Sequence, residues 1–333
     1  RTWSLEEFYK IYKHLNIDFY VYFFESEVEK DGKKIVLDLL KKGIAKRSEG
    51  AVIIDLDQYG LKQFLLLKTD GTSLYSTKDL ALAQKKFKKY KIDKSYYITD
   101  ARQSFYFKQL FKTLEVIGFK KDMVHIPYEF VTLKERAMSS RLGNVVLYED
   151  FENEVVRKVT DETKKRHPDW GEKEIRRVSL VLAHSAMKYG MISYGNNSVI
   201  IFDMERSLQF TGNTGPYLQY TYARISSILK KAQIKKISLK TIKVLTLPEE
   251  KNIIMHLSKF PKIIEKSALH FEPSYISHYL FELAQLFSIF YETVPVLKAS
   301  DDARRERLTL LFSIRIVMGK GFSFLGISPL EKM

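Results

Sequence analysis

The spacing of apolar and polar positions changes partway along the chain. The change divides the sequence into an N-terminal part and a C-terminal part with different predicted structures. Before about residue 135, stretches with helical spacing such as SLEEFYKIYKHL and SFYFKQLFKTLEVIGF alternate with short apolar runs such as GAVIIDL and KQFLLLKTDG. This alternation is typical of a parallel, doubly wound α/β sheet. Ligands of such sheets bind beyond the carboxyl ends of the strands, where we expect Asp70, Asp100 and Gln103.

From Glu149 onward, strand patterns nearly vanish and long amphipathic segments dominate. Their spacing predicts helices over 149–167, 172–190, 215–233, 248–268, 273–293 and 301–319. The predicted fold class is therefore α/β plus all-α, with the α/β part first and a helical bundle after it.

The composition limits the classes of protein to which this sequence can belong. Hydrophobic residues make up 45% of the 333, no apolar run is long enough to span a membrane, and no signal peptide is recognisable. The absence of cysteine excludes disulfides and thiolate chemistry and fits a cytoplasmic protein. The formal net charge of +15 favours a polyanionic partner; the alternative is a biased genome or a lysine-rich solvated surface.

Two stretches suggest ligand sites. In KTDGTSLYSTKDLALA, Tyr75 and Asp79 lie one helical turn apart, so a phenol and a carboxylate could hold a planar cation. The alternative is an acid in a first helical turn beside a half-buried tyrosine. In ERAMSSRLGNVVLYED, two hydroxyls and an arginine could grip phosphate, or the stretch could be a polar connector.

The stretch FTGNTGPYLQYTYAR predicts a helix that begins after Asn213 or Thr214, with proline in its first turn. The i, i+3, i+7 spacing then puts three side chains on one face, namely Tyr217, Tyr220 and Arg224. Two aromatic rings beside a guanidinium could form the edge of a core or a stacking platform for unpaired bases.

These stretches, in this order, resemble arginyl-tRNA synthetase, a class I aminoacyl-tRNA synthetase. DGTSLYSTKDLA is similar to the family's arginine-pocket segment, DARQSFYFKQLF to the next strand–helix junction, and MSSRLGNVV to its KMSKS-type loop. GNTGPYLQYTYARI resembles the start of its anticodon-binding domain, and LGISPLEKM its final segment.

The resemblance implies roles for particular residues. Those expected to contact arginine are Tyr75, Asp79 and Gln103. The loop that closes on ATP would comprise Met138, Ser139, Ser140 and Arg141, with Tyr106 also facing ATP. The anticodon surface would comprise Tyr217, Tyr220, Arg224, Tyr279 and Met333. Tyr222 points away from that face and is expected in the core.

The resemblance also implies an organisation and a reaction. Residues 1–135 would be the second half of a Rossmann-type catalytic domain, 136–205 the KMSKS-type loop and a helical connecting region, and 206–333 an all-α anticodon-binding domain. Arginine, ATP with Mg²⁺, and tRNA(Arg) would be the substrates, and an arginyl-adenylate the intermediate. We expect no protein-bound metal, because the seven histidines are scattered along the sequence.

The sequence also departs from the family. Ala137 and Leu142 stand where basic residues are frequent in the loop, and Tyr106 stands where histidine is often found. No His-x-Gly-His motif occurs, so we expect the chain to need an N-terminal half that carries it, on the same polypeptide or as a separate partner. Two alternatives are a non-catalytic tRNA-binding or regulatory derivative, and a relative that charges another amino acid.

Overall fold

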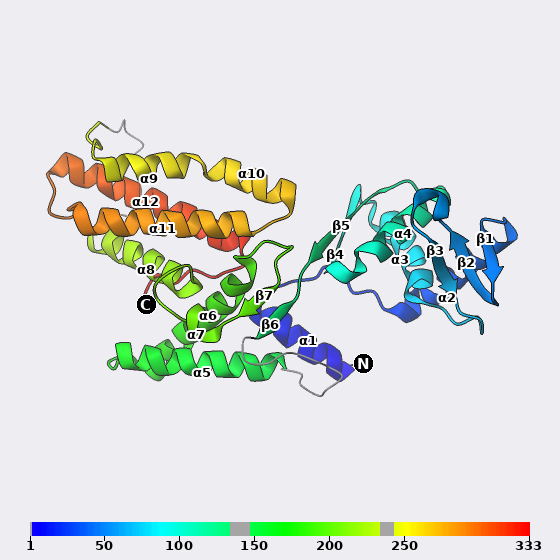
Figure 1. The fold of residues 1–333 in the computed structure, drawn as a ribbon. Coiled ribbons are helices and arrows are strands. Elements are labelled where there is room, and N and C mark those ends of the chain that lie inside the picture. The colour runs from blue at the N-terminus through cyan, green and yellow to red at the C-terminus, as the bar shows by residue number, and fades with distance from the viewer. Residues whose placement is uncertain (1, 134–146, 234–242) are drawn as a thin grey trace. The chain divides into compact units, whose positions relative to one another are not determined.

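The structure, a computed structural model, describes residues 2–133, 147–233 and 243–333 (Figure 1). The chain forms two compact units. One is Phe19–Phe130; the other combines Arg1–Asp18 with Val131–Met333. The smaller unit is therefore inserted in sequence between two parts of the larger one, and each unit is described by itself below.

Short strands and helices alternate in the unit Phe19–Phe130. In chain order they are η1 Glu25–Glu27, α2 Glu29–Lys41, β1 Ala45–Ser48, β2 Ala51–Asp55, η2 Asp57–Tyr59, β3 Gln63–Leu67, α3 Tyr75–Tyr90, β4 Lys94–Asp100, η3 Ala101–Gln103, α4 Ser104–Val116 and β5 Asp122–Tyr128. The predicted helices and strands of this region are thus present, and β1 is an additional strand.

The strand pairing differs in part from the predicted parallel sheet. β4 and β5 are parallel, as expected, with Ile98 opposite Ile126. β1, β2 and β3 instead form an antiparallel meander, with Ala45 opposite Ile54. Turns at Glu49–Gly50 and at η2 are too short for the crossover that parallel neighbours require. Within the described residues, β3 is not hydrogen-bonded to β4.

One core holds this unit together. It lies between α2, α3, α4 and the meander, and its fully buried side chains are Val36, Leu56, Leu66, Leu80, Leu110 and Leu114. Burial of one such leucine contributes roughly 1.5–3 kcal/mol of transfer free energy, so this core fixes where the start of α3 lies.

The first part of the other unit contains a second core. Its elements are α1 Thr2–His14, β6 Val131–Leu133, α5 Tyr148–Arg166, α6 Glu172–Ile192, β7 Ile200–Phe202 and α7 Met204–Ser207. β6 and β7 are parallel, and Phe151, Val155 and Leu182 pack together between α5 and α6. α1 begins at Thr2 and therefore includes Ser4.

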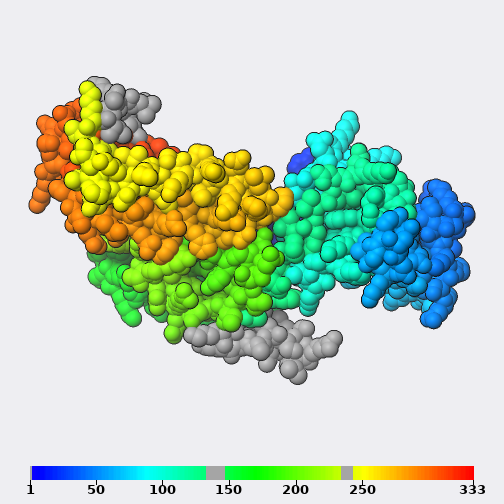
Figure 2. All heavy atoms as spheres, turned by 45° about the horizontal axis from the view of Figure 1, so that its top comes forward, coloured from blue at the N-terminus to red at the C-terminus, as the bar shows by residue number. Residues whose placement is uncertain are grey.

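The remaining helices form a bundle, as predicted. They are α8 Gly215–Lys231, α9 Pro248–Ser258, α10 Phe260–His270, α11 Ser274–Thr293 and α12 Asp301–Phe324. α9, α11 and α12 pack against one another in Figure 1, and Figure 2 shows α9 to α12 as one closely packed surface. The helix expected over 248–268 is two helices, because Pro261 lacks the N–H that a continuous helix would need.

α8 begins in very close contact with α6. A Cβ placed on Gly215 would lie 2.4 Å from the carbonyl oxygen of Ser185, where no side chain fits. Glycine is therefore required at this crossing for steric reasons. No helix among the described residues is long and apolar enough to cross a membrane.

We predict that Gly215→Ala lowers the free energy of unfolding by about 1–3 kcal/mol, because the new methyl group overpacks the α6–α8 contact. Urea denaturation followed by circular dichroism measures the change. The matched control is Gly319→Ala in α12, whose added Cβ would lie an ordinary 3.6 Å from the ring of Tyr222. That variant should be neutral or slightly stabilising; equal losses in both variants would contradict the steric explanation.

Candidate functional site

The first turn of α3 is fixed to the end of β3 by side-chain hydroxyls. Ser76 Oγ donates a hydrogen bond to the carbonyl oxygen of Leu65 at 2.5 Å, and Thr77 Oγ1 donates to that of Leu66. Thr77 Oγ1 also accepts from the N–H of Leu74 at 3.0 Å, which satisfies one free amide of the helix start. The position of Asp79, half a turn further on, is therefore tightly determined.

Asp79 is half-buried and bonded to Tyr106. The Tyr106 hydroxyl donates to Asp79 Oδ2 at 2.5 Å, joining α3 to α4. Burial raises the pKa of the Asp79 carboxyl above its ordinary value, and the hydrogen bond from Tyr106 opposes that shift. Burial, reinforced by the charge of Asp79, raises the pKa of Tyr106, so its phenol remains a donor.

Lys86, one of the two lysines of α3 whose charge acts on Asp79, has another partner. Lys86 Nζ lies 3.9 Å from the ring centroid of Tyr97 and donates to Ser95 Oγ at 3.0 Å. Burial lowers the pKa of Lys86, and the charge of Asp79 opposes this. Among the residues that the structure describes, no lysine or arginine forms an ion pair with Asp79. Lys86 and Lys78 act on Asp79 through their charge only, so a cationic ligand would meet a carboxylate without an ion pair among the described residues.

The other residues expected around arginine are more exposed. The side chain of Tyr75 is 71% exposed. Gln103 is exposed at the start of α4, and its Nε2 donates to Asp100 Oδ2 at 3.0 Å. The structure thus brings Asp79 together with Tyr106, whereas Gln103 contacts Asp100. Tyr106 was assigned to ATP by the resemblance, but its ring lies edge-on to Phe64 and its hydroxyl is directed at Asp79.

The KMSKS-type loop lies outside the described residues. This holds for all four residues that the resemblance assigns to it, namely Met138, Ser139, Ser140 and Arg141.

In the other unit, the start of α8 has the predicted cap. Thr214 Oγ1 accepts a hydrogen bond from the N–H of Tyr217 at 3.2 Å. Asn213, the other candidate cap, instead accepts a hydrogen bond from the Tyr189 hydroxyl at 2.5 Å. Both residues of the motif are therefore used, one to begin α8 and one to tie the preceding loop to α6.

Tyr220 and Arg224 form an exposed cluster with a residue of α11, Tyr291. The Arg224 guanidinium lies 5.1 Å from the ring centroid of each tyrosine. It donates to the hydroxyl of Tyr220 and to that of Tyr291, the latter at 3.1 Å. Two rings and a cation, each ring about 40% exposed, form a surface that suits unstacked bases.

Met333 reaches the same surface from the C-terminal segment. Tyr220 and Met333 line one cavity of about 270 Å³ with residues of α5 and α6. Gln219, fully buried beside Tyr220, holds the segment in place: its Nε2 donates to the carbonyl oxygen of Ser328 at 2.7 Å. Its Oε1 accepts from the N–H of Leu330 at 2.9 Å.

Two residues expected on the anticodon surface, Tyr279 and Tyr217, are more buried than that role requires. Tyr279 is only 3% exposed; its ring stacks on His256 with centroids 4.2 Å apart, so it supports the bundle from inside and cannot face a base in this arrangement. Tyr217 is half-buried against Phe281 of α11. Tyr222 is buried, as predicted.

Sequence reasoning did not find Tyr291 or Gln219. Tyr291 lies on α11, and nothing in the local pattern indicates that α11 runs beside α8. Gln219 was recognisable only as a polar residue on the apolar face of α8, at the spacing of Tyr222.

Comparisons with known proteins show which family the chain belongs to. Residues 2–204 match the family described as tRNA synthetases class I (R), catalytic domain, and residues 218–333 match the DALR anticodon binding domain. Together with the α/β unit and the helical bundle, these matches define a class I aminoacyl-tRNA synthetase. The chain belongs to the arginyl-tRNA synthetase family, which confirms the resemblance and the predicted fold class.

Curated relatives and solved structures agree. The arginine–tRNA ligases of Bdellovibrio bacteriovorus and Halothermothrix orenii are 36% and 34% identical to this chain. The alignments cover 100% of this chain but only 58% and 59% of those proteins. The solved arginyl-tRNA synthetases of Plasmodium falciparum and Thermus thermophilus share the fold, with TM-scores of 0.82 and 0.85 at 24% identity. They are matched over 99% and 96% of this chain and 57% and 61% of theirs.

We predict that Tyr106→Phe raises the pKa of Asp79 further, because the hydrogen bond that opposes the effect of burial is lost. Titration of the carboxyl carbon by NMR measures the shift. Tyr75→Phe is the control: it removes a hydroxyl from the exposed tyrosine of the same helix and should leave the pKa of Asp79 unchanged. A fall in that pKa in Tyr106→Phe would contradict the prediction.

Proposed function

We propose that this chain supplies the arginine pocket, the KMSKS-type loop and the anticodon-binding domain of an enzyme that attaches arginine to its tRNA. The observation that carries the proposal is Asp79, a half-buried carboxylate with a neutral phenol as partner and no described ion pair. The family match over both parts of the chain supports the same function.

The substrate guanidinium would pair with Asp79. A guanidinium presents two parallel N–H donors to a carboxylate, which the single ammonium of lysine cannot do. Tyr106 would keep one carboxylate oxygen oriented while the other faces the ligand. Tyr75 and Gln103 would complete the pocket; Gln103 would do so after exchanging its bond to Asp100 for one to the substrate.

The expected chemistry is adenylate formation followed by transfer. The arginine carboxylate would attack the α-phosphate of ATP, bound as its Mg²⁺ complex, and release pyrophosphate. A ribose hydroxyl at the end of the tRNA would then take the arginyl group from the adenylate. Such steps depend mainly on positioning and charge stabilisation, which in this chain we assign to the loop Met138–Arg141.

The cluster of Tyr220, Arg224 and Tyr291 would receive bases of the tRNA anticodon loop, and Met333 would border it. Its geometry supports this role, since each tyrosine ring is accessible and the guanidinium adds positive charge. The net charge of +15 would add sequence-independent attraction for the tRNA backbone.

One alternative function has a specific observation in its favour. Leu142 stands at a position that is often basic in this family, which would suit a tRNA-binding protein without activity. The two functions differ in one requirement. An enzyme needs Asp79, whereas a binding protein does not.

We predict that Asp79→Asn abolishes most arginine activation. The assay is arginine- and tRNA-dependent ATP–pyrophosphate exchange by the chain joined to, or mixed with, a segment that carries His-x-Gly-His. The value of kcat/KM for arginine should fall by about 30-fold or more, since removing one partner of a buried charge pair costs about 2–5 kcal/mol.

Asp93→Asn, at an exposed acid of the same unit, is the control and should leave the exchange rate unchanged. Full activity of Asp79→Asn would overturn the arginine pocket. Absence of exchange from every version of a correctly folded chain that still binds tRNA would favour the alternative function.

We predict that Tyr220→Ala weakens tRNA(Arg) binding by about 1–3 kcal/mol, the contribution of one stacked base. Filter binding at a fixed salt concentration measures it. Tyr194→Ala, which removes another exposed tyrosine of the same unit, should have no effect. Unchanged affinity in Tyr220→Ala would exclude this cluster from the anticodon interface, whatever the outcome for Asp79.

A further inference from the structure

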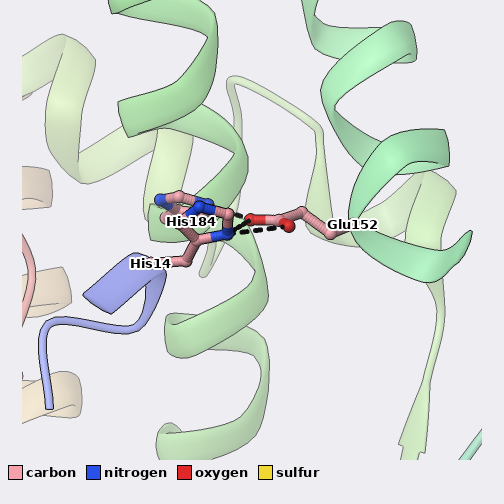
Figure 3. Close-up of side chains that lie close together, drawn as sticks. All are labelled: His14, Glu152 and His184. Carbon is pink, nitrogen blue, oxygen red and sulfur yellow. Dashed lines mark hydrogen bonds and ion pairs between the residues drawn. The ribbon is translucent and has the colours of Figure 1, made fainter. Parts of the chain in front are cut away.

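Two histidines far apart in the sequence converge on one glutamate (Figure 3). His14 comes from the end of α1, Glu152 from α5 and His184 from α6. His14 Nδ1 lies 3.0 Å from Glu152 Oε2, and His184 Nε2 lies 2.6 Å from Glu152 Oε1. One ligand atom from each of the three residues lies within 4.8 Å of the other two.

Glu152 is a nearly buried acid without a lysine or arginine partner among the described residues. Its side chain is only 10% exposed. Within the part of the chain that the structure describes, its partners are the two imidazoles and the hydroxyl of Tyr148, at 3.3 Å. A buried carboxylate is costly without a cation, and this group of partners contains no lysine or arginine.

We propose that His14, Glu152 and His184 bind one divalent transition-metal ion of the Zn²⁺ class. Two imidazole nitrogens and a carboxylate are a ligand set that suits Zn²⁺, with water in the fourth position. Tetrahedral ligands at about 2.0–2.1 Å from the ion lie roughly 3.3 Å apart. The two measured separations from Glu152 are slightly shorter, so small side-chain movements make room for the ion.

A further hydrogen bond already orients the carboxylate of Glu152. The Tyr148 hydroxyl donates to Glu152 Oε1 from one turn earlier on α5. Such outer hydrogen bonds orient a ligand, and their removal typically lowers metal affinity 10- to 100-fold. The ring planes of His14 and His184 are inclined by only 26° with centroids 5.8 Å apart, so both nitrogens approach the carboxylate from the same side.

The ion would hold α1 in place. α1 contains no fully buried residue, and its apolar side chains Leu5 and Ile11 are only half-buried, so apolar packing holds it less firmly than it holds α5 and α6. A metal bridge from His14 to α5 and α6 would supply that attachment at the residue where α1 ends. We assign the ion a structural role because it would join three helices, α1, α5 and α6, at the end of α1; the water in the fourth position does not by itself indicate that role.

The test uses Co²⁺ and Zn²⁺ as probes on the full chain without a histidine tag. Co²⁺ should bind at one equivalent with the visible absorption of a tetrahedral site, and Zn²⁺ should displace it. His14→Gln and His184→Gln should each weaken Co²⁺ binding at least tenfold, and Tyr148→Phe by about tenfold. His270→Gln, at an exposed histidine of α10, is the matched control and should bind normally.

Thermal unfolding gives an independent readout on the unaltered chain. Zn²⁺ should raise its Tm and EDTA should reverse the rise, whereas Mg²⁺, which prefers oxygen ligands, should not. The proposal is overturned if Co²⁺ shows no tetrahedral absorption, or if binding is the same in the His184→Gln and His270→Gln chains. Either result would leave a cluster held by hydrogen bonds alone.

Discussion

The close approach of α8 to α6 is the constraint on which the helical unit depends. Gly215 lets the backbones touch at Ser185, and Gln219, one turn later, fills the remaining polar space with hydrogen bonds to Ser185 Oγ and to the C-terminal segment. With α8 fixed there, Tyr220 and Arg224 face outward while Leu218 and Tyr222 enter the core. The exposed aromatic cluster and the placement of Met333 both follow from this one crossing.

In the smaller unit, the cost of burying Asp79 is set against the hydrogen bond that it accepts from Tyr106. The hydroxyls of Ser76 and Thr77 and the surrounding leucines force Asp79 into a half-buried position that raises its pKa. The Tyr106 hydroxyl offsets part of that cost without neutralising the charge. A lysine in the same place would satisfy the carboxylate permanently. A phenol orients it and leaves it available to a cationic ligand.

Much of the fold could be predicted from the sequence, because the apolar spacing of the helices repeats over many residues and the strands are short apolar runs. The long helices from Tyr148 to Phe324 lie where the pattern put them, apart from the division at Pro261, whereas the short α7 was not predicted. The antiparallel meander could not be predicted, since an apolar run does not reveal the direction of its neighbour. The candidate sites were predictable only in part. Helical spacing places Tyr220 and Arg224 on one face. The burial of Tyr279, the hydrogen bond between Tyr106 and Asp79 and the proximity of His14 to His184 depend on contacts between distant segments, which spacing does not reveal.

The insertion of Phe19–Phe130 within the other unit has a consequence for folding kinetics. α1 can reach α5 and α6 only when a loop of more than a hundred residues has closed, and every contact that it makes with them is therefore among the most non-local in the molecule. The cost of that closure falls sharply once the inserted unit is compact, because a folded insert brings its two ends to a defined separation. We therefore expect α1 to dock on α5 and α6 late in folding, after the inserted unit has become compact.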